Sequence, residues 1–134
     1  MTVKINADTS DGAKEDYEKL CGPEPLIDVF VRNLSTKQLI EKIFIHQGYS
    51  KDFTNEFRNI DFLFIDGDHS INGCTFDFNT YFPFVSKGGV VALHDYYPDR
   101  PELGPTYVVE EIIGKSDEIS PLQIEESLWI GKKI

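Results

Sequence analysis

Cysteine is scarce in this sequence of 134 residues, which contains only Cys21 and Cys74. The two lie far apart and form no Cys-x-x-Cys pair, which is the spacing that zinc sites and thioredoxin-like redox motifs use. A disulfide or a cysteine-based metal site is therefore disfavoured. We expect two free thiols in a reducing compartment.

Basic residues are also few: 13 Lys and Arg stand against 23 Asp and Glu, for a formal net charge of −10. Affinity for nucleic acid rests largely on cations that neutralise phosphates, so this balance argues against a nucleic-acid partner. No apolar run approaches the roughly 20 residues that span a membrane. The amino terminus also lacks the basic and apolar segments of a signal peptide. The expectation is a cytoplasmic protein with no membrane partner.

Apolar residues make up 40% of the chain and aromatic residues 13%, which is typical of a packed globular protein. Neither a repeat nor a linker is found, so a single domain over residues 1–134 is expected. Strand-like and helix-like runs alternate, which predicts an α/β fold with a doubly wound, mostly parallel sheet and a C-terminal antiparallel hairpin. The expected strands cover 2–5, 42–46, 60–65, 90–93, 119–124 and 127–134, and the expected helices cover 25–34, 51–57 and 106–114.

The most informative stretch runs from Ile60 to Ser70. Five of its first six residues are apolar, which predicts a strand buried on both faces of a parallel sheet. The strand ends abruptly in Asp66-Gly67-Asp68-His69, whose charges no core accepts unpaired. These side chains should therefore stand at the carboxyl edge of a sheet, where open α/β folds bind ligands.

A second unit of the same kind follows. The turn Lys87-Gly88-Gly89 leads into the apolar run Val90–Leu93, which ends in His94-Asp95. Neighbouring parallel strands end at one edge, so Asp66 and Asp95 are expected side by side. Paired carboxylates suit a hard divalent cation. The competing interpretation is that they cap helices or accept hydrogen bonds in turns.

The sequence contains three histidines. His69 can act as a general base near neutral pH, although a histidine in a turn is more often a hydrogen-bonded surface residue. His94 is expected to point to the face opposite Asp95 and to pack in the core. His46 is assigned no role.

Three segments of the chain carry a family resemblance. They are Phe64-Ile65-Asp66-Gly67-Asp68-His69-Ser70, Tyr81-Phe82-Pro83 and Gly88-Gly89-Val90-Val91-Ala92-Leu93-His94-Asp95-Tyr96. Together they resemble class I S-adenosylmethionine-dependent methyltransferases. The resemblance is greatest to their small O-methyltransferase branch, which includes catechol-type and macrolide-sugar-type enzymes. It implies a Rossmann-like sheet and methyl transfer to a small hydroxylated substrate. It also implies S-adenosylmethionine as cofactor and a divalent metal such as Mg²⁺.

Carried over position by position, the resemblance implies Asp66 and Asp95 as metal ligands. Tyr96 stands where an Asn or Asp often completes that metal site. His69 stands where catechol-type enzymes carry a Lys that takes the substrate proton, so His69 and Asp66 are the catalytic candidates.

The same resemblance implies a cofactor site. Tyr49 and Ser50 stand where the adenine is contacted, and Asp66 is a further candidate for contact with the cofactor. Asn6 or Asp8 would bind the ribose hydroxyls. The loop over residues 98–105 is the candidate substrate-side loop, because it follows Asp95.

The chain departs from the family at its front, because no glycine-rich turn or first strand precedes the strand over residues 2–5. An N-terminally truncated sheet is therefore expected. Its second and fourth strands could pair directly, or it could borrow a strand from a second copy in a homodimer. Alternatively, the chain is a fragment of a longer gene product. Internal repair or dimerisation is favoured. Without that turn, the chain alone is expected to bind the cofactor weakly or not at all.

Two other functions stay open. Asp66-Gly67-Asp68 matches the Asp-x-Asp of metal-dependent glycosyltransferases, although this match is short. A non-catalytic methyltransferase remnant, or a dimeric interaction domain, would keep the sheet and its acidic edge without binding the cofactor.

Overall fold

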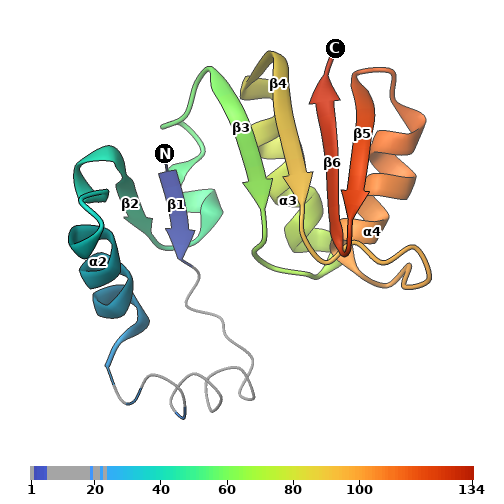
Figure 1. Ribbon diagram of the computed structural model, residues 1–134. Helices are drawn as coiled ribbons and strands as arrows, with labels where there is room; N and C mark the ends of the chain where they lie inside the picture. The colour runs from blue at the N-terminus through green and yellow to red at the C-terminus, as the bar shows by residue number, and fades with distance from the viewer. Residues whose placement is uncertain (1, 6–18, 20–21, 23) are drawn as a thin grey trace. The chain divides into compact units, whose positions relative to one another are not determined.

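A computed structural model of the chain describes residues 2–5, 19, 22 and 24–134. The chain forms two compact units, residues 1–52 and 53–134, and the described strands form one sheet in each (Figure 1). Together they make the mixed α/β architecture that the sequence predicted. None of the described helices is both long and apolar enough to cross a bilayer.

The first unit holds a pair of parallel strands and one helix. β1 (Thr2–Ile5) pairs in parallel with β2 (Phe44–Gln47), and α2 (Leu26–Thr36) lies between them in the chain. Short 3-10 turns, Ile40–Lys42 and Ser50–Phe53, stand on either side of β2. The strands and the helix predicted here are confirmed, whereas the helix predicted over 51–57 is reduced to the second of these turns.

The second unit is built on a four-stranded sheet in the order β3-β4-β6-β5. β3 (Ile60–Ile65) and β4 (Val85–Leu93) are parallel, and β6 (Leu128–Lys133) pairs antiparallel with both β4 and β5 (Ile119–Glu125). This confirms the parallel pair and the closing hairpin.

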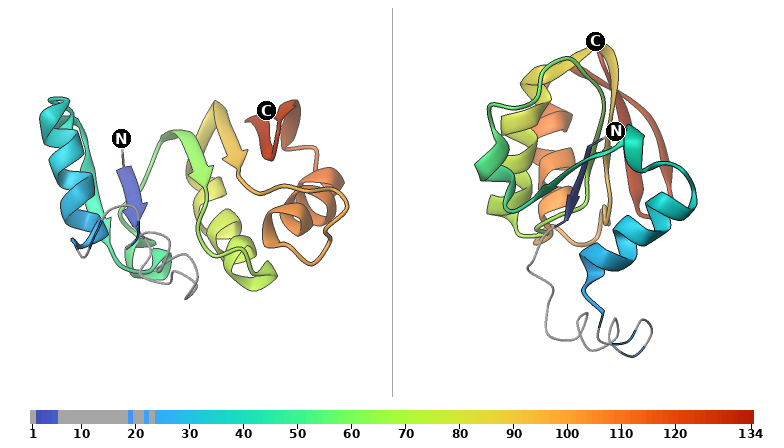
Figure 2. Two further views of the ribbon diagram at one scale, coloured as in Figure 1. Left: turned by 60° about the horizontal axis from the view of Figure 1, so that its bottom comes forward. Right: turned by 90° about the vertical axis from the view of Figure 1, so that its left-hand side faces the viewer.

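Two helices cover one face of this sheet (Figure 2). They are α3 (Ile71–Tyr81), followed by a 3-10 turn at Phe82–Phe84, and α4 (Gly104–Tyr107). The chain continues from α4 as a π-helical stretch, Val108–Ile112, and a 3-10 turn, Ile113–Lys115. A helical segment was predicted over 106–114 and is confirmed.

The core lies between the sheet and these helices. Leu93 and Val91 from β4 and Val108 are fully buried, and Trp129 from β6 is 3% exposed. Cys74 of α3 is also buried as a free thiol, and burial raises its pKa to about 12, with Asp77 and Asp68 adding to the effect. A free thiol is therefore confirmed for Cys74, whereas Cys21 lies outside the described residues.

The prediction that β3 is buried on both faces is wrong. Phe62 is 60% exposed and Phe64 is 48% exposed, and their rings stack with centroids 6.4 Å apart. The reason is that β3 is an edge strand of its sheet, and both helices of this unit lie on the other face (Figure 2).

One further expectation is corrected. The residues 87–89 do not form a turn before β4 but lie inside it, where the β3–β4 register shifts and Gly88 takes a φ of +82°. Within the two units, β1 pairs with β2 and β3 pairs with β4, and direct pairing of the second and fourth strands of the family pattern stays a prediction. A strand borrowed from another copy stays a prediction.

Replacing Leu93 tests the core of the second unit. Leu93→Ala removes a fully buried side chain and should lower the free energy of unfolding by about 2–5 kcal/mol, because it leaves a cavity. Leu122→Ala is the matched control, since Leu122 is 55% exposed and should cost at most about 0.5 kcal/mol. Urea unfolding followed by the fluorescence of Trp129, the only tryptophan, measures both. Equal losses would contradict this description of the core.

Candidate metal and active site at the ends of β3 and β4

The register of β3 and β4 decides which side chains meet at the edge of the sheet. The last paired residues are Ile65 and Leu93, and His94 N donates to Ile65 O at 3.1 Å, one step beyond. Asp66 and Asp95 therefore leave two adjacent strands at the same end. Their predicted proximity is confirmed.

The backbone at Asp95 is unusual, with a φ of +58°. Few residues other than glycine adopt this left-handed conformation, and aspartate is among those enriched there. The chain just after it is fixed from two directions: Tyr96 N donates to Ser127 O at 2.9 Å, and Tyr97 N donates to Thr106 Oγ1 at 3.1 Å. Such a conformation persists only where the surroundings hold it, and it is often found at functional sites.

The loop after β3 is held just as firmly. Asp68 Oδ1 accepts from Ser70 N at 2.8 Å, and Ser70 Oγ caps α3 by accepting from Gly73 N at 3.0 Å. His69 O accepts from Gly104 N at 2.7 Å. A Cβ on Gly104 would lie only 2.3 Å from Ser70 O, so this contact requires glycine.

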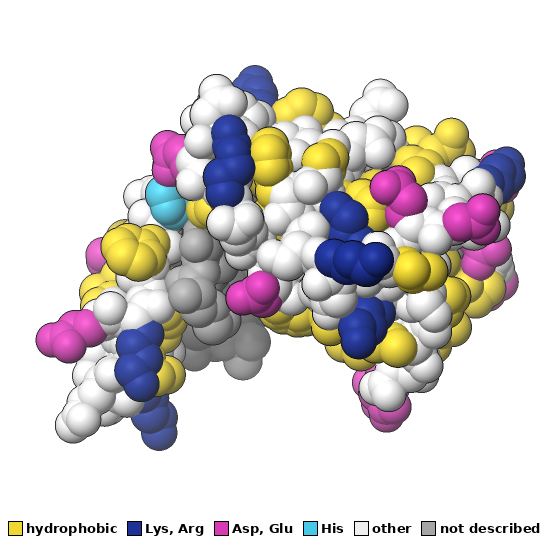
Figure 3. All heavy atoms as spheres, turned by 90° about the horizontal axis from the view of Figure 1, so that it is seen from above, with side chains coloured by type: hydrophobic (Ala, Val, Ile, Leu, Met, Phe, Trp, Pro, Cys, Tyr) yellow, Lys and Arg dark blue, Asp and Glu magenta, His cyan; other side chains and the backbone are white. Residues whose placement is uncertain are grey.

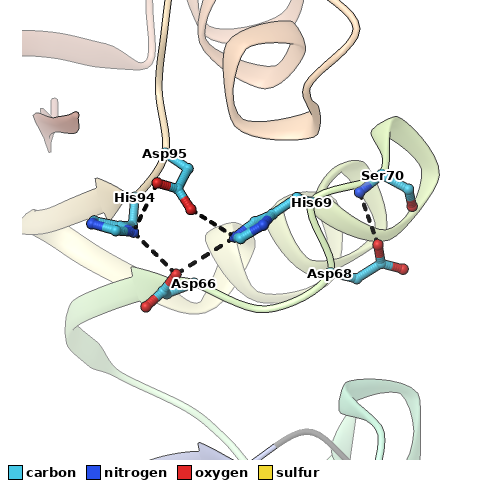
Figure 4. Close-up of polar contacts among 6 residues, drawn as sticks. All are labelled: Asp66, Asp68, His69, Ser70, His94 and Asp95. Atoms are coloured by element: carbon cyan, nitrogen blue, oxygen red, sulfur yellow. Dashed lines mark hydrogen bonds and ion pairs between the residues drawn. The ribbon is translucent and has the colours of Figure 1, made fainter. Parts of the chain in front are cut away.

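These contacts turn two side chains of the loop in different directions. Figure 4 shows His69 facing Asp66 and Asp95, whereas Asp68 faces Ser70. Asp68 is thus occupied by the start of α3. The Asp-x-Asp pairing of Asp66 with Asp68 has no support in this arrangement.

Two imidazoles flank the two carboxylates (Figure 4). His69 Nε2 lies 3.6 Å from Asp66 Oδ1 and 3.3 Å from Asp95 Oδ2. His94 Nδ1 lies 3.3 Å from Asp66 Oδ1 and 3.4 Å from Asp95 Oδ1. One ligand atom each of Asp66, His69 and Asp95 lies within 4.8 Å of the other two, which is close enough to share a metal ion.

The prediction that His94 points away from Asp95 is wrong. It assumed that side chains alternate strictly past the end of β4, but the left-handed backbone at Asp95 breaks this alternation. His94 instead contacts both carboxylates. Its Nδ1 is buried and has no hydrogen-bond partner.

The Tyr96 side chain is directed to Glu110, so its predicted place as a third metal ligand has no support here. This side chain is buried, and its hydroxyl donates to Glu110 Oε1 at 2.6 Å. Burial, together with this bond and the Glu110 charge, raises the pKa of Tyr96 to about 12. The third group beside Asp66 and Asp95 is His69, which the sequence singled out as a base and not as a ligand.

Of the candidate cofactor residues, Asp66 lies in the cluster, two belong to the first unit and two lie outside the described residues. Tyr49 and Ser50 follow β2 in the first unit, where Tyr49 N donates to Asp52 Oδ2 at 3.2 Å and Ser50 opens a 3-10 turn. Asn6 and Asp8 lie outside the described residues. Their roles stay predictions.

Two cations of the second unit lie at the end of the sheet opposite the site. Figure 3 views the chain from the end at which β3 begins and shows Lys and Arg as well as Asp and Glu side chains among hydrophobic ones. Arg58, just before β3, lies over the Phe84 ring at 4.2 Å, and Lys133, at the end of β6, lies over the Phe82 ring at 4.4 Å. The two aspartates of the site stand at the other end of β3 and β4, which favours the binding of a cation there.

Comparison with known proteins gives a consistent family. The model of a methyltransferase domain family matches residues 6–96. An uncharacterized protein of Acanthamoeba polyphaga mimivirus is 39% identical over 70 residues, which are 49% of this chain and 31% of that protein. The chain thus spans under a third of this curated relative.

Solved structures of methyltransferases share the fold. The O-methyltransferase NovP matches with a TM-score of 0.67 at 20% identity, over 98% of this chain and 60% of that one. An O-methyltransferase from Bacillus cereus, solved with S-adenosylhomocysteine, matches with a TM-score of 0.62 at 17% identity, over 80% and 57%. The methyltransferase MycE of the mycinamycin pathway, solved with Mg and S-adenosylhomocysteine, matches with a TM-score of 0.55 at 16% identity, over 69% and 33%.

The hydrogen bond of Tyr96 can be tested by its removal. Tyr96→Phe leaves Glu110 without its donor and should lower the free energy of unfolding by about 1–3 kcal/mol, as is typical of bonds to charged groups. Tyr97→Phe is the matched control, because Tyr97 is exposed and should change stability by at most about 0.5 kcal/mol. Urea unfolding compares the two, and an unchanged Tyr96→Phe protein would mean that the bond is absent in solution.

Proposed function

The chain belongs to the methyltransferase domain family, and from this membership we propose that it carries an S-adenosylmethionine-dependent O-methyltransferase domain assisted by a divalent metal. The substrate class that we propose is a small hydroxylated molecule. The observation that supports the metal most strongly is the cluster of Asp66, His69 and Asp95 at the carboxyl ends of two parallel strands.

The donor set fits a divalent cation. Two carboxylates would balance the charge of the ion, and they converge with an imidazole on one point. Three protein ligands leave coordination positions open, as catalytic metal sites require. An aspartate pair that only capped helices would not converge in this way, and the cap of α3 is supplied by Ser70.

The reaction needs a deprotonated and aligned hydroxyl. When bound, S-adenosylmethionine supplies the methyl group: its bond to sulfur breaks as the new bond to the substrate oxygen forms, and the hydroxyl proton goes to a base. Asp66 and Asp95 would hold the ion that lowers the pKa of the hydroxyl and orients it. An imidazole of the cluster would take the proton. His69 is the candidate that the sequence named, and His94 is a second one.

Cofactor binding is the second requirement of the proposed function. Two of the similar structures contain S-adenosylhomocysteine, the product of the cofactor. This chain covers only 57% of one of them and 33% of the other. Activity should therefore be sought at cofactor concentrations well above those that saturate the relatives.

A non-catalytic remnant is the second candidate. It would keep the fold and the aspartates yet bind neither the cofactor nor a metal. Titration with S-adenosylhomocysteine and with uridine diphosphate, each with and without Mg²⁺, separates these functions. A methyltransferase binds the first, a glycosyltransferase binds the second with metal, and a remnant binds neither.

Replacing the aspartates tests the metal role. Asp66→Asn and Asp95→Asn keep the size of the side chain but remove its charge, and each should lower metal-dependent methyl transfer by about 100-fold or more, which is the scale for losing one electrostatic partner of a reacting oxygen. Transfer of labelled methyl from millimolar S-adenosylmethionine to a panel of catechol-like and sugar-like hydroxyl acceptors measures this.

The control for both variants is Asp61→Asn. Asp61 is exposed and lies in β3, the strand that ends just before Asp66. It should leave transfer unchanged. Full activity of Asp66→Asn, or transfer that persists after chelation of divalent metal, would overturn the metal assignment.

Calorimetric titration tests the cofactor site. The chain alone is expected to bind S-adenosylmethionine with a dissociation constant well above 1 μM, which corresponds to a binding free energy weaker than about −8 kcal/mol. The reason is that this chain spans only 57% and 33% of the relatives solved with S-adenosylhomocysteine, so residues outside the match can contribute to their cofactor sites. A low-micromolar constant would show that another segment holds the methionine end of the cofactor.

A further inference from the structure

The metal site proposed above contains an imidazole, and this imidazole decides which metal it takes. We propose that His69 is the third protein ligand, through Nε2, and that the site binds a first-row transition metal such as Zn²⁺ or Co²⁺ in preference to Mg²⁺. This inference rests on the proposed function and deepens it, because it names the third ligand and the class of metal of the same site.

The spacing of the donor atoms is that of metal ligands. His69 Nε2 lies 3.6 Å from Asp66 Oδ1 and 3.3 Å from Asp95 Oδ2. A charge-assisted N–H···O hydrogen bond is shorter, at about 2.7–2.9 Å. Two ligands of a tetrahedral ion with bonds of about 2.0–2.1 Å stand roughly 3.3 Å apart. The donors thus stand at distances that suit a shared ion better than a direct pair.

No oxygen ligand competes for this position among the described residues near the cluster. Tyr96, where an Asn or Asp often stands in the family, is buried and donates to Glu110. Asp68 accepts from Ser70 N and faces away from the site (Figure 4). The imidazole of His69 therefore takes the place of a third oxygen.

The backbone holds His69 in place for this role. Its carbonyl accepts from Gly104 N at 2.7 Å, and the next residue, Ser70, caps α3. The ring is thus carried by a turn that is anchored on two helices. A ligand fixed in this way binds a metal without first having to order a loop.

The chemistry of the donors sets the selectivity. Imidazole suits Zn²⁺, Co²⁺ and Ni²⁺, whereas Mg²⁺ prefers oxygen ligands only. A nitrogen bound to the metal can no longer take the substrate proton. That role then passes to His94, whose Nδ1 is the other imidazole nitrogen that faces both carboxylates.

The test measures metal binding directly, without turnover. The full chain is titrated by calorimetry with Zn²⁺ and, separately, with Mg²⁺, and the wild type should bind Zn²⁺ at least about tenfold more tightly. His69→Gln should weaken Zn²⁺ binding by about tenfold or more and change Mg²⁺ binding by less than about threefold, because Gln offers no imidazole nitrogen. His46→Gln, which removes a histidine of β2 in the first unit, is the matched control and should change neither.

A spectroscopic readout does not depend on any variant. On addition of Zn²⁺ to the wild-type chain labelled with ¹⁵N, the imidazole nitrogens of His69 should shift strongly, whereas those of His46 should not. Unshifted His69 nitrogens, equal Zn²⁺ affinity of His69→Gln and wild type, or a wild-type preference for Mg²⁺ would each overturn the inference.

Asp66→Asn separates this inference from the proposed function. If Asp66→Asn weakens Zn²⁺ binding and His69→Gln does not, the two aspartates hold the metal and only the role of His69 is wrong. If neither variant changes Zn²⁺ binding, the metal site of the proposed function fails as well, and this inference fails with it.

Discussion

The parallel ladder between β3 and β4 is the constraint on which the site depends. Its register ends with Ile65 opposite Leu93, so Asp66 and Asp95 leave the sheet together. A slip of one residue would move every side chain of a strand to the other face. Leu93 and Val91 are buried against α3 and the α4 segment, and this packing holds the register. The core and the site are therefore two consequences of one pairing.

Residues far away in the sequence hold the backbone around the site. Gly104 and Thr106 at the start of α4 hold the backbone at His69 and Tyr97. Ser127, just before β6, holds Tyr96. The turns that carry the two aspartates and His69 are thus braced by the last third of the chain. Such bracing is what keeps a left-handed Asp95 in place.

Composition and exposure disagree most clearly at β3. Its apolar run is typical of a strand covered on both faces, yet Phe62 and Phe64 are exposed in a sheet of which β3 forms the edge. The ring of His94 lies 6.5 Å from that of Phe64, so the apolar surface begins beside the acidic cluster. A run of apolar residues indicates that both faces of a strand can be buried, but it does not identify the segments that would pack against them.

Part of the local structure of this chain follows from its sequence, although α3 was not among the predicted helices. The bounds of β1 and β3, the helix α2 and the final hairpin were predicted from periodicity alone, because local spacing fixes which backbone conformation buries an apolar face. The meeting of Asp66 and Asp95 followed from the rule that parallel strands end together. The partners of the other site residues did not follow. His94 joined the cluster because the backbone at Asp95 turns left-handed, and Tyr96 left it because Glu110 lies within reach. His69 became a candidate ligand because Gly104 packs against its turn. These three facts depend on contacts between segments distant in the chain, which only the tertiary structure brings together.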